Sequence, residues 1–323
     1  MSNFRSLRSA VAAAALGLAL ATGAAPAFAA EDLTITVPAN PGGGWDQTGR
    51  AMAEVLQGEK LARSVEVDNV AGAGGTIGLA QFASRPGEPD ALLVMGLVMT
   101  GAILTNNSPV TLESTTPLAR LTSEYEGLVV PADSPLKTVG ELVEKLKADP
   151  ASVSWGGGSA GGTDHILAGL VMKAVGADTS KLNYVAHSGG GEALASILGG
   201  HVTVGVSGVG EFVEQAKTGK LRFLAVSSDA RIDGVEAPTL AESGVDVVLG
   251  NWRGVVGAPD IDDEERAALL VTLDAMAATE AWKKILSARG WTDAYLSGDA
   301  FAEFLKEDDA RVVQTLKDIG LVE

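Results

Sequence analysis

Cysteine is absent from the 323 residues of the chain. This absence excludes disulfides, thiol chemistry and cysteine-ligated metal sites, and it also excludes a lipid-attachment cysteine. Positive charge is scarce as well, since 24 Lys and Arg stand against 41 Asp and Glu and give a formal net charge of −17. A surface of this sign repels nucleic acids and anionic membranes. We therefore expect no nucleic-acid partner.

Histidine occurs only three times, at His165, His187 and His201. These positions form neither H-x-x-x-H nor H-E-x-x-H, the spacings by which a helix presents zinc ligands. We expect His201, in a glycine turn, to be structural, and we expect no metal and no other cofactor. His165 and His187 each lie within a few residues of a glycine-rich loop, where a ring N–H could donate to a carboxylate.

The N-terminal segment combines Arg5 and Arg8 with an unbroken run of small and apolar residues at 9–25. Residues 27–29 then satisfy the small-x-small rule for cleavage, so we expect residues 1–29 to be a secretory signal peptide. A transmembrane anchor is the alternative, for which the run is short and rich in alanine. Cleavage would leave 323 − 29 = 294 residues with a formal charge of −17 − 2 = −19. The expected location is the periplasm.

Glycine, with 40 copies, gathers in loops that follow apolar runs. Where a strand breaks into glycines and a helix then begins, bare backbone N–H groups lie at the helix N-terminus, and such an end attracts anions. We expect these loops to form a ligand clamp made mostly of backbone amides. The loops are Pro41 to Asp46, Ala71 to Thr76, Gly156 to Thr163 and Ser188 to Glu192.

Short β-like runs alternate with helical patterns, which predicts βαβ units and an α/β fold. In such folds ligands bind at the carboxyl ends of the strands, where these glycine loops fall. The expected strands are 33–37, 65–67, 91–95, 153–155, 183–186, 202–206 and 222–226, and the expected helices are 47–56, 76–83, 139–147, 164–175, 192–198 and 211–217.

The alternation restarts after an apolar strand closed by two prolines, at residues 127–135, where we place a crossing between two domains. A strand at 251–256 would return to the first domain, and helices at 262–278 and 300–319 would pack on its sheet. We expect domain 1 to comprise 30–133 and 250–323, and domain 2 to comprise 134–249.

Two enzymatic motifs overlap in the third glycine loop. Residues 156–161 satisfy G-x-G-x-x-G, but such a pattern is easily matched among many glycines, and exported proteins lack a ready nicotinamide supply. The same stretch satisfies G-x-S-x-G around Ser159, with Asp178 and then His187 or His201 in α/β-hydrolase order. A secreted serine hydrolase is therefore the main enzymatic alternative. Against it, Asp178 lies close to His187 in sequence, whereas triad members normally come from separate strand ends.

Three further side chains near the loops allow two interpretations each. Asp46 either serves the helix dipole and pairs with Arg50, or holds a ligand hydroxyl or water. Trp45 is either a partly buried wall or a ligand contact. Arg253 is either a salt-bridge partner near the hinge or a contact for a carboxylate.

Motifs along the whole expected mature chain resemble the extracytoplasmic solute receptors of the tripartite tricarboxylate transporters, the Bug receptors. Each motif is weak alone, and their shared order carries the resemblance. They are Pro41 to Gly44 with Asp46, Asn69 with Gly72 to Gly75, Val130-Pro131 with Ser134-Pro135, Gly161 to Thr163 with His165, Gly199 to Val202, Lys217 to Arg222 with Leu224 to Val226, and Pro238 to Val245.

The resemblance implies a type II periplasmic binding protein, in which two Rossmann-like α/β domains joined by crossing strands close on a small organic acid. It also implies two integral membrane subunits, one large and one small, as partners of a monomeric, non-enzymatic receptor. Gly189 to Leu194 and His187 look like the citrate branch, so we expect a di- or tricarboxylate. The expected ligand-binding residues are Asn40, Gly42, Gly43, Gly44, Trp45, Asp46, Gly74, Gly75, Thr76, Thr100, Ser159, Thr163, His165, His187 and Arg253.

Two positions depart from the family pattern. Many members have an aromatic-aspartate pair where this chain has Val206-Ser207-Gly208, and a Tyr-Lys-Gly where it has Ala186 to Gly189. Ligand contacts at these two positions do not carry over from the resemblance.

Overall fold

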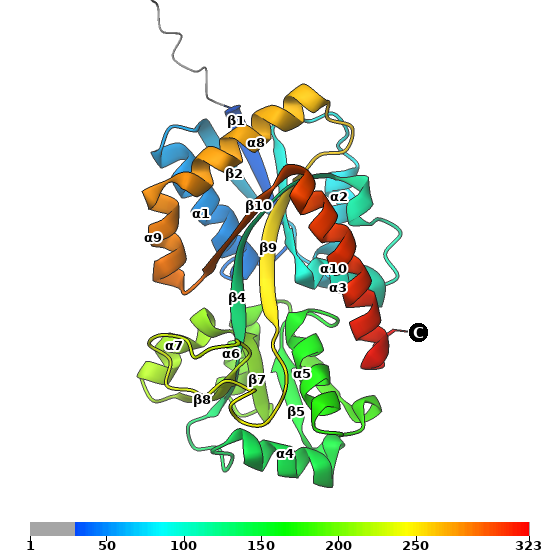
Figure 1. Cartoon of the computed structure of the whole chain (residues 1–323), viewed down its shortest axis with the longest axis vertical. Coiled ribbons are helices and arrows are strands. Elements are labelled where there is room, and N and C mark those ends of the chain that lie inside the picture. Colours follow the sequence, from blue (N-terminus) through cyan, green and yellow to red (C-terminus); the bar gives the residue numbers. More distant parts are fainter. Residues whose placement is uncertain (1–29, 323) are drawn as a thin grey trace, which may run out of the picture.

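The computed structural model describes residues 30–322 and shows two α/β domains connected by two long neighbouring strands (Figure 1). The expected signal peptide lies outside the described residues. Within them, no helix is both long and apolar enough to cross a membrane.

The first domain begins with β1 (Ala30–Val37), whose alternate residues Leu33, Ile35 and Val37 are buried. β1 pairs in parallel with both β2 (Ala62–Asn69) and β3 (Ala91–Gly96), as the alternation predicts. The helices that connect these strands are α1 (Gly44–Gly58) and α2 (Thr76–Ala83). All of these expected elements are confirmed, and α1, β1 and β2 are longer than the ranges expected from the sequence.

β4 (Thr116–Pro131) and β9 (Gly250–Gly257) carry the chain between the domains and run side by side in Figure 1. β4 pairs antiparallel with β9 as far as Tyr125, and from Glu126 onward it pairs with strands of the second sheet. One 16-residue strand thus belongs to both sheets. The expected domain limits near residues 133 and 250 remain predictions.

The second domain repeats the strand-helix alternation around a sheet of β5 (Ser154–Gly157), β6 (Asn183–Ala186), β7 (Val204–Gly208) and β8 (Leu221–Val226). β5 lies between β6 and β7 and is parallel to both. The helices are α4 (Val139–Ala148), α5 (Thr163–Ala174), α6 (Gly190–Leu198) and α7 (Val209–Lys217). Thr138 is the N-cap of α4 and forms a capping box with Glu141.

The C-terminal segment returns to the first domain through α8 (Asp263–Ala278), α9 (Glu280–Arg289), β10 (Thr292–Ser297) and α10 (Gly298–Asp318). The sequence reading missed α9, β10 and α3 (Leu97–Thr105). α3 follows β3 with no polar turn, so its apolar residues read as one run. Short 3-10 turns complete the fold at Ala73–Gly75, Leu112–Ser114, Pro150–Ser152 and Thr179–Lys181.

Candidate functional site

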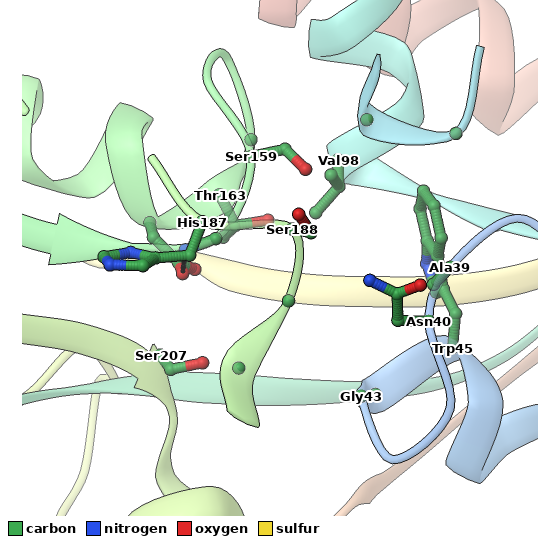
Figure 2. Close-up of a pocket in the computed structure, with 18 of the residues that line it drawn as sticks. Ala39, Asn40, Gly43, Trp45, Val98, Ser159, Thr163, His187, Ser188 and Ser207 are labelled. Atoms are coloured by element: carbon green, nitrogen blue, oxygen red, sulfur yellow. Dashed lines mark hydrogen bonds between the residues drawn. The ribbon is translucent and has the colours of Figure 1, made fainter. Parts of the chain in front are cut away.

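A cleft of about 430 Å³ lies between the two domains and is lined by both. Figure 2 shows Asn40 and Trp45 of the first domain opposite Ser159, Ser188 and Ser207 of the second. The carboxyl ends of the parallel strands β1, β5 and β6 open into it, which is where ligands bind in such sheets.

The first-domain side of the cleft presents two helix N-termini. α1 begins after Gly43 and α2 begins after Gly75, and neither N-cap residue makes a side-chain capping bond. The first-turn amides of α1 therefore have no acceptor within the helix. At the start of α2, the preceding 3-10 turn engages two amides, since Gly75 N donates to the Gly72 carbonyl at 2.9 Å and Thr76 N donates to the Ala73 carbonyl. Gly75 has φ +93°, and a Cβ there would lie 2.7 Å from the Trp45 ring, so only glycine lets the α2 loop pack on this wall.

Asp46 holds the first glycine loop in place from the first turn of α1. Its carboxylate accepts hydrogen bonds from Gly42 N at 2.9 Å, from Asn69 Nδ2 at 2.9 Å and from Arg50 Nε at 3.0 Å. Although burial opposes the effect, the bonds from Arg50, Gly42 and Asn69 keep the pKa of Asp46 below its usual value. Asp46 lies outside the cleft lining. Of its two interpretations, these contacts favour the structural one.

The second-domain side carries a cluster of three acids, of which Asp164 and Glu126 are buried and Glu211 is half-buried. Asp164, in the first turn of α5, accepts from Gly158 N at 2.6 Å, and burial raises its pKa to about 6. Burial and the charge of Asp164 raise the pKa of Glu211 to about 7, although Ser207 Oγ donates to it at 3.2 Å. Glu126 on β4 is fully buried, and burial together with its two acidic neighbours raises its pKa well above the usual value.

The crossing strands close the cleft with a buried ion pair. Arg253 of β9 pairs with Glu124 of β4, and both side chains are only 4–5% exposed. Trp291 Nε1 donates to the same carboxylate at 3.1 Å, and the Arg253 guanidinium lies over the Trp291 ring. Burial and then the charge of Arg289 lower the pKa of Arg253 to about 9, so Arg253 stays charged at neutral pH. Of the two interpretations of Arg253, a salt-bridge partner or a carboxylate contact, the structure shows the salt bridge, and this pair is buried.

The three histidines have different surroundings. His165 lies outside the cleft lining, stacks on Tyr184 with ring centroids 4.1 Å apart, and accepts at Nδ1 from Gly161 N. Burial lowers the pKa of His165 to about 4. His187 lines the cleft and donates from Nδ1 to the Gly157 carbonyl at 2.9 Å. His201 is exposed.

The cleft brings together ten of the fifteen residues expected from the sequence. Five lie outside its lining: Asp46 and His165 as described, Gly42 one residue away, Thr76 donating to the Ala73 carbonyl, and Thr100 buried. Those in the lining are Asn40, Gly43, Gly44, Trp45, Gly74, Gly75, Ser159, Thr163, His187 and Arg253.

Several lining residues were not expected from the sequence: Glu124, Asp164, Ser207, Glu211 and Asn251. One signal was available. Glu124 and Glu126 interrupt a long apolar strand at alternate positions, and a charge in such a strand marks a functional site or an ion pair. For Glu211 no such signal exists, because an acid in the first turn of a helix is ordinary.

The hydrolase triad is not assembled. Asp178 caps a 3-10 turn, where it accepts from Ser180 and pairs with Lys181. The Nδ1 proton of His187, which a triad carboxylate would hold, is bonded to a backbone carbonyl instead. No group of three or more His, Asp or Glu side chains in residues 30–322 is arranged to hold a metal ion.

Two α/β domains joined by crossing strands around a ligand-sized cleft define a periplasmic binding protein. The sequence model of the family described as "Tripartite tricarboxylate transporter family receptor" matches residues 49–321. The chain belongs to this family. It is therefore a solute-binding receptor, a class that is not enzymatic. Receptors of this family are periplasmic.

Known proteins agree with this assignment. The chain is 28% identical to Protein BugT of Bordetella pertussis over 95% of its own length and 97% of BugT. A TctC solute-binding protein from Polaromonas is 29% identical, with a TM-score of 0.65 over 89% of this chain and 98% of that one. MatC from Rhodopseudomonas palustris, solved with bound malate, is 20% identical, with a TM-score of 0.78 over 89% and 99%.

Proposed function

We propose that this protein is an exported periplasmic receptor that binds a small organic carboxylate in the interdomain cleft and delivers it to a large and a small membrane subunit of a tripartite tricarboxylate transporter. The observation that carries the proposal is the pair of uncapped N-termini, those of α1 and α2, on the first-domain side. Amides at contact distance hold a carboxylate even in a protein of net charge −17, because they act inside a water-poor cleft.

Arg253 supports this anion site from the side. Its guanidinium lies so close to the α1 loop that a Cβ on Gly44 would be 2.2 Å from Nη2. The pair with Glu124 cancels most of its charge at long range, but its edge still adds positive potential beside the loop amides. One carboxylate of the ligand would therefore lie between Gly44 and Gly75.

The resemblance to the citrate branch refines the proposal to a di- or tricarboxylate. Ser159, Thr163 and His187 of the second domain would then contact the remainder of the ligand. Closure of the two domains around β4 and β9 would enclose the ligand, and the membrane subunits would recognise the closed form. The receptor would act as a monomer without catalysis.

A thermal-shift screen of mono-, di- and tricarboxylates tests the proposal. A binding acid raises the melting temperature by an amount that grows with the logarithm of its concentration over Kd. Gly44→Val, which places a side chain against Arg253 and over the α1 amides, should abolish the shift, and Gly58→Val at the exposed end of α1 is the matched control. If no carboxylate raises the melting temperature of the wild-type protein, the proposal is wrong.

A further inference from the structure

The middle of the third glycine loop, residues 158–162, has few means of holding its own conformation. It connects β5 to α5 and lines the cleft with Gly158, Ser159, Ala160 and Gly162. Three of its five residues are glycines, which lose the most conformational freedom on folding, and the other two have small side chains. A turn bond from Gly162 N to the Ser159 carbonyl at 3.0 Å closes its end. A fixed conformation of the rest depends on groups from elsewhere in the domain.

Side chains hold Gly158 at both of its backbone hydrogen-bonding groups. Tyr184, on β6 beside β5, donates from its hydroxyl to the Gly158 carbonyl at 3.0 Å, and Asp164 Oδ2 accepts from the Gly158 amide at 2.6 Å. The hydroxyl can approach because residue 157 is a glycine, since a Cβ there would lie 2.5 Å from the Tyr184 oxygen. Burial, and then the charges of Asp164 and Glu126, raise the pKa of Tyr184 well above its usual value, so the hydroxyl stays a donor.

His165 holds the other end of the loop and the Tyr184 ring together. Its Nδ1 accepts from the Gly161 amide at 3.1 Å, so His165 must be neutral, and burial lowers its pKa to about 4. Gly161 has φ +75°, in the left-handed region that favours glycine. The imidazole also stacks on the Tyr184 ring, with centroids 4.1 Å apart and an angle of 9° between the planes. One side chain therefore links Gly161 to the ring that holds Gly158.

The two stacked rings lie outside the cleft, whereas the loop that they hold lies in its wall. Neither His165 nor Tyr184 is among the lining residues, and both Ser159 and Thr163 are. Figure 2 shows Ser159 and Thr163 on the second-domain side of the cleft. The two rings can therefore act on a bound solute only through the loop.

We propose that Tyr184 and His165 are positioning residues, which hold the 158–162 loop in its binding conformation before the solute arrives. The inference rests on the proposed function, because the cleft that the loop lines is the one proposed to take a carboxylate. A loop that is ordered in advance spends no binding free energy on losing backbone freedom, so affinity rises without a new contact. In this role His165 supports the loop and does not touch the ligand.

Two variants that each break one contact test whether the pair orders the loop. Tyr184→Phe keeps a ring for the stack and removes the hydroxyl bond to Gly158. His165→Phe also keeps a ring and removes the acceptor for Gly161. In each variant without ligand, the amides of residues 156–163 should exchange hydrogen about fivefold or more faster than in the wild-type protein. Mass spectrometry of the peptide that contains the loop measures the rates.

Tyr295→Phe is the matched control. Tyr295 is half-buried like Tyr184, and its hydroxyl donates to Asp274 at 2.6 Å in the first domain, away from the cleft. The control removes the same kind of bond and should leave the exchange of the loop unchanged. His165→Asn keeps an acceptor near the position of Nδ1, so the loop should exchange more slowly in this variant than in His165→Ala, which loses both the acceptor and the ring.

Isothermal titration with butanoate, succinate and citrate measures the consequence for binding. For whichever of these acids binds the wild-type protein, Tyr184→Phe and His165→Phe should raise Kd about fivefold or more, and Tyr295→Phe should leave it unchanged. The titrations are done well below the melting temperature of every variant. A role in stability alone would lower that temperature and leave both Kd and the exchange of the loop as in the wild-type protein.

The outcomes separate this inference from the proposed function. Unchanged exchange of the loop in both phenylalanine variants would overturn the inference, and so would faster exchange with an unchanged Kd. An equal loss of affinity in Tyr295→Phe would also overturn it, because any lost hydroxyl would then have the same effect. If no acid binds the wild-type protein, the proposed function is wrong, and the exchange rates alone then decide whether the pair orders the loop.

Discussion

Asp46 and Asp164 occupy equivalent places in the two domains and have opposite surroundings. Each lies in the first turn of a helix that follows a glycine loop, and each accepts a bond from a glycine amide of that loop. Asp46 also receives Arg50 and Asn69, so it is a charged, satisfied support. Asp164 has Glu126 and Glu211 as neighbours instead. The same local motif thus holds an aspartate with a cationic partner in one domain and an aspartate among other acids in the other.

The difference arises from tertiary contacts that the local sequence does not encode. Arg50 can be read from its spacing to Asp46, because residues four apart share a helix face. Asn69 reaches Asp46 only because β2 pairs with β1. The acids around Asp164 come from β4 and α7, which are brought together by the second sheet. Which charged groups surround each aspartate therefore depends on the strands and helices that the two sheets bring together.

The ion pair between Arg253 and Glu124 lies on the strands that cross between the domains, and breaking it should have the largest effect. Arg253→Met leaves Glu124 buried and unpaired beside the other acids, which should cost about 3–5 kcal/mol of unfolding free energy. Urea denaturation measures the loss. Adding Glu124→Gln to Arg253→Met should restore most of the stability. If the double variant is as unstable as the single one, lost packing and not the unpaired acid is responsible.

Neutralising the two equivalent aspartates sharpens the comparison directly. Asp46→Asn weakens bonds from three donors to a charged acceptor and should cost about 2 kcal/mol. Asp164→Asn at pH 8 should cost less than about 0.5 kcal/mol or stabilise the protein, because it removes a buried charge that has no cation. Chemical denaturation of both variants provides the test. Equal losses of unfolding free energy in the two variants would mean that Asp46 and Asp164 contribute equally to stability, and would contradict the comparison.

The acid cluster should make the ligand-free protein more stable at mildly acidic pH. The pKa values of Asp164 and Glu211 are raised in the fold to about 6 and about 7 from 3.8 and 4.5. For a raised pKa, the stabilisation is complete below the unfolded value and is lost as the pH rises through the folded value.

Unfolding free energy should therefore fall between pH 5 and pH 8, by on the order of 1–2 kcal/mol. Glu211→Gln should flatten this slope, and Glu214→Gln should keep it. A wild-type stability that is constant across this range, or that rises with pH, would contradict the assignment of buried, uncompensated acids.

Ser159→Ala should have the smallest effect. Ser159 lines the cleft from the second-domain loop, and its removal should change stability by less than about 0.5 kcal/mol and weaken the carboxylate by less than about tenfold. Ester hydrolysis should be absent from both proteins in a nitrophenyl-ester assay. Turnover by the wild-type protein that Ser159→Ala abolishes would restore the hydrolase alternative.

The sequence could predict most of the architecture because its alternation of strands and helices is regular. The first glycine loop, α1 and the capping box at Thr138 all follow from local chemistry. It could not predict α9 and β10, since β10 is held by pairing with β4 across a long separation. At the site, the glycine-rich loops identified the first-domain side of the cleft, whereas Glu211 has no local signature as a site residue.

The central claim is that the ligand carboxylate binds to the amides of the first domain. A crystal structure of the complex with the tightest acid from the screen tests it most directly. The account predicts that carboxylate oxygens accept hydrogen bonds from backbone amides in the loops of Gly43 to Trp45 and Gly74 to Thr76. A carboxylate bound instead against Ser207 and Glu211, with those loops empty, would contradict the account.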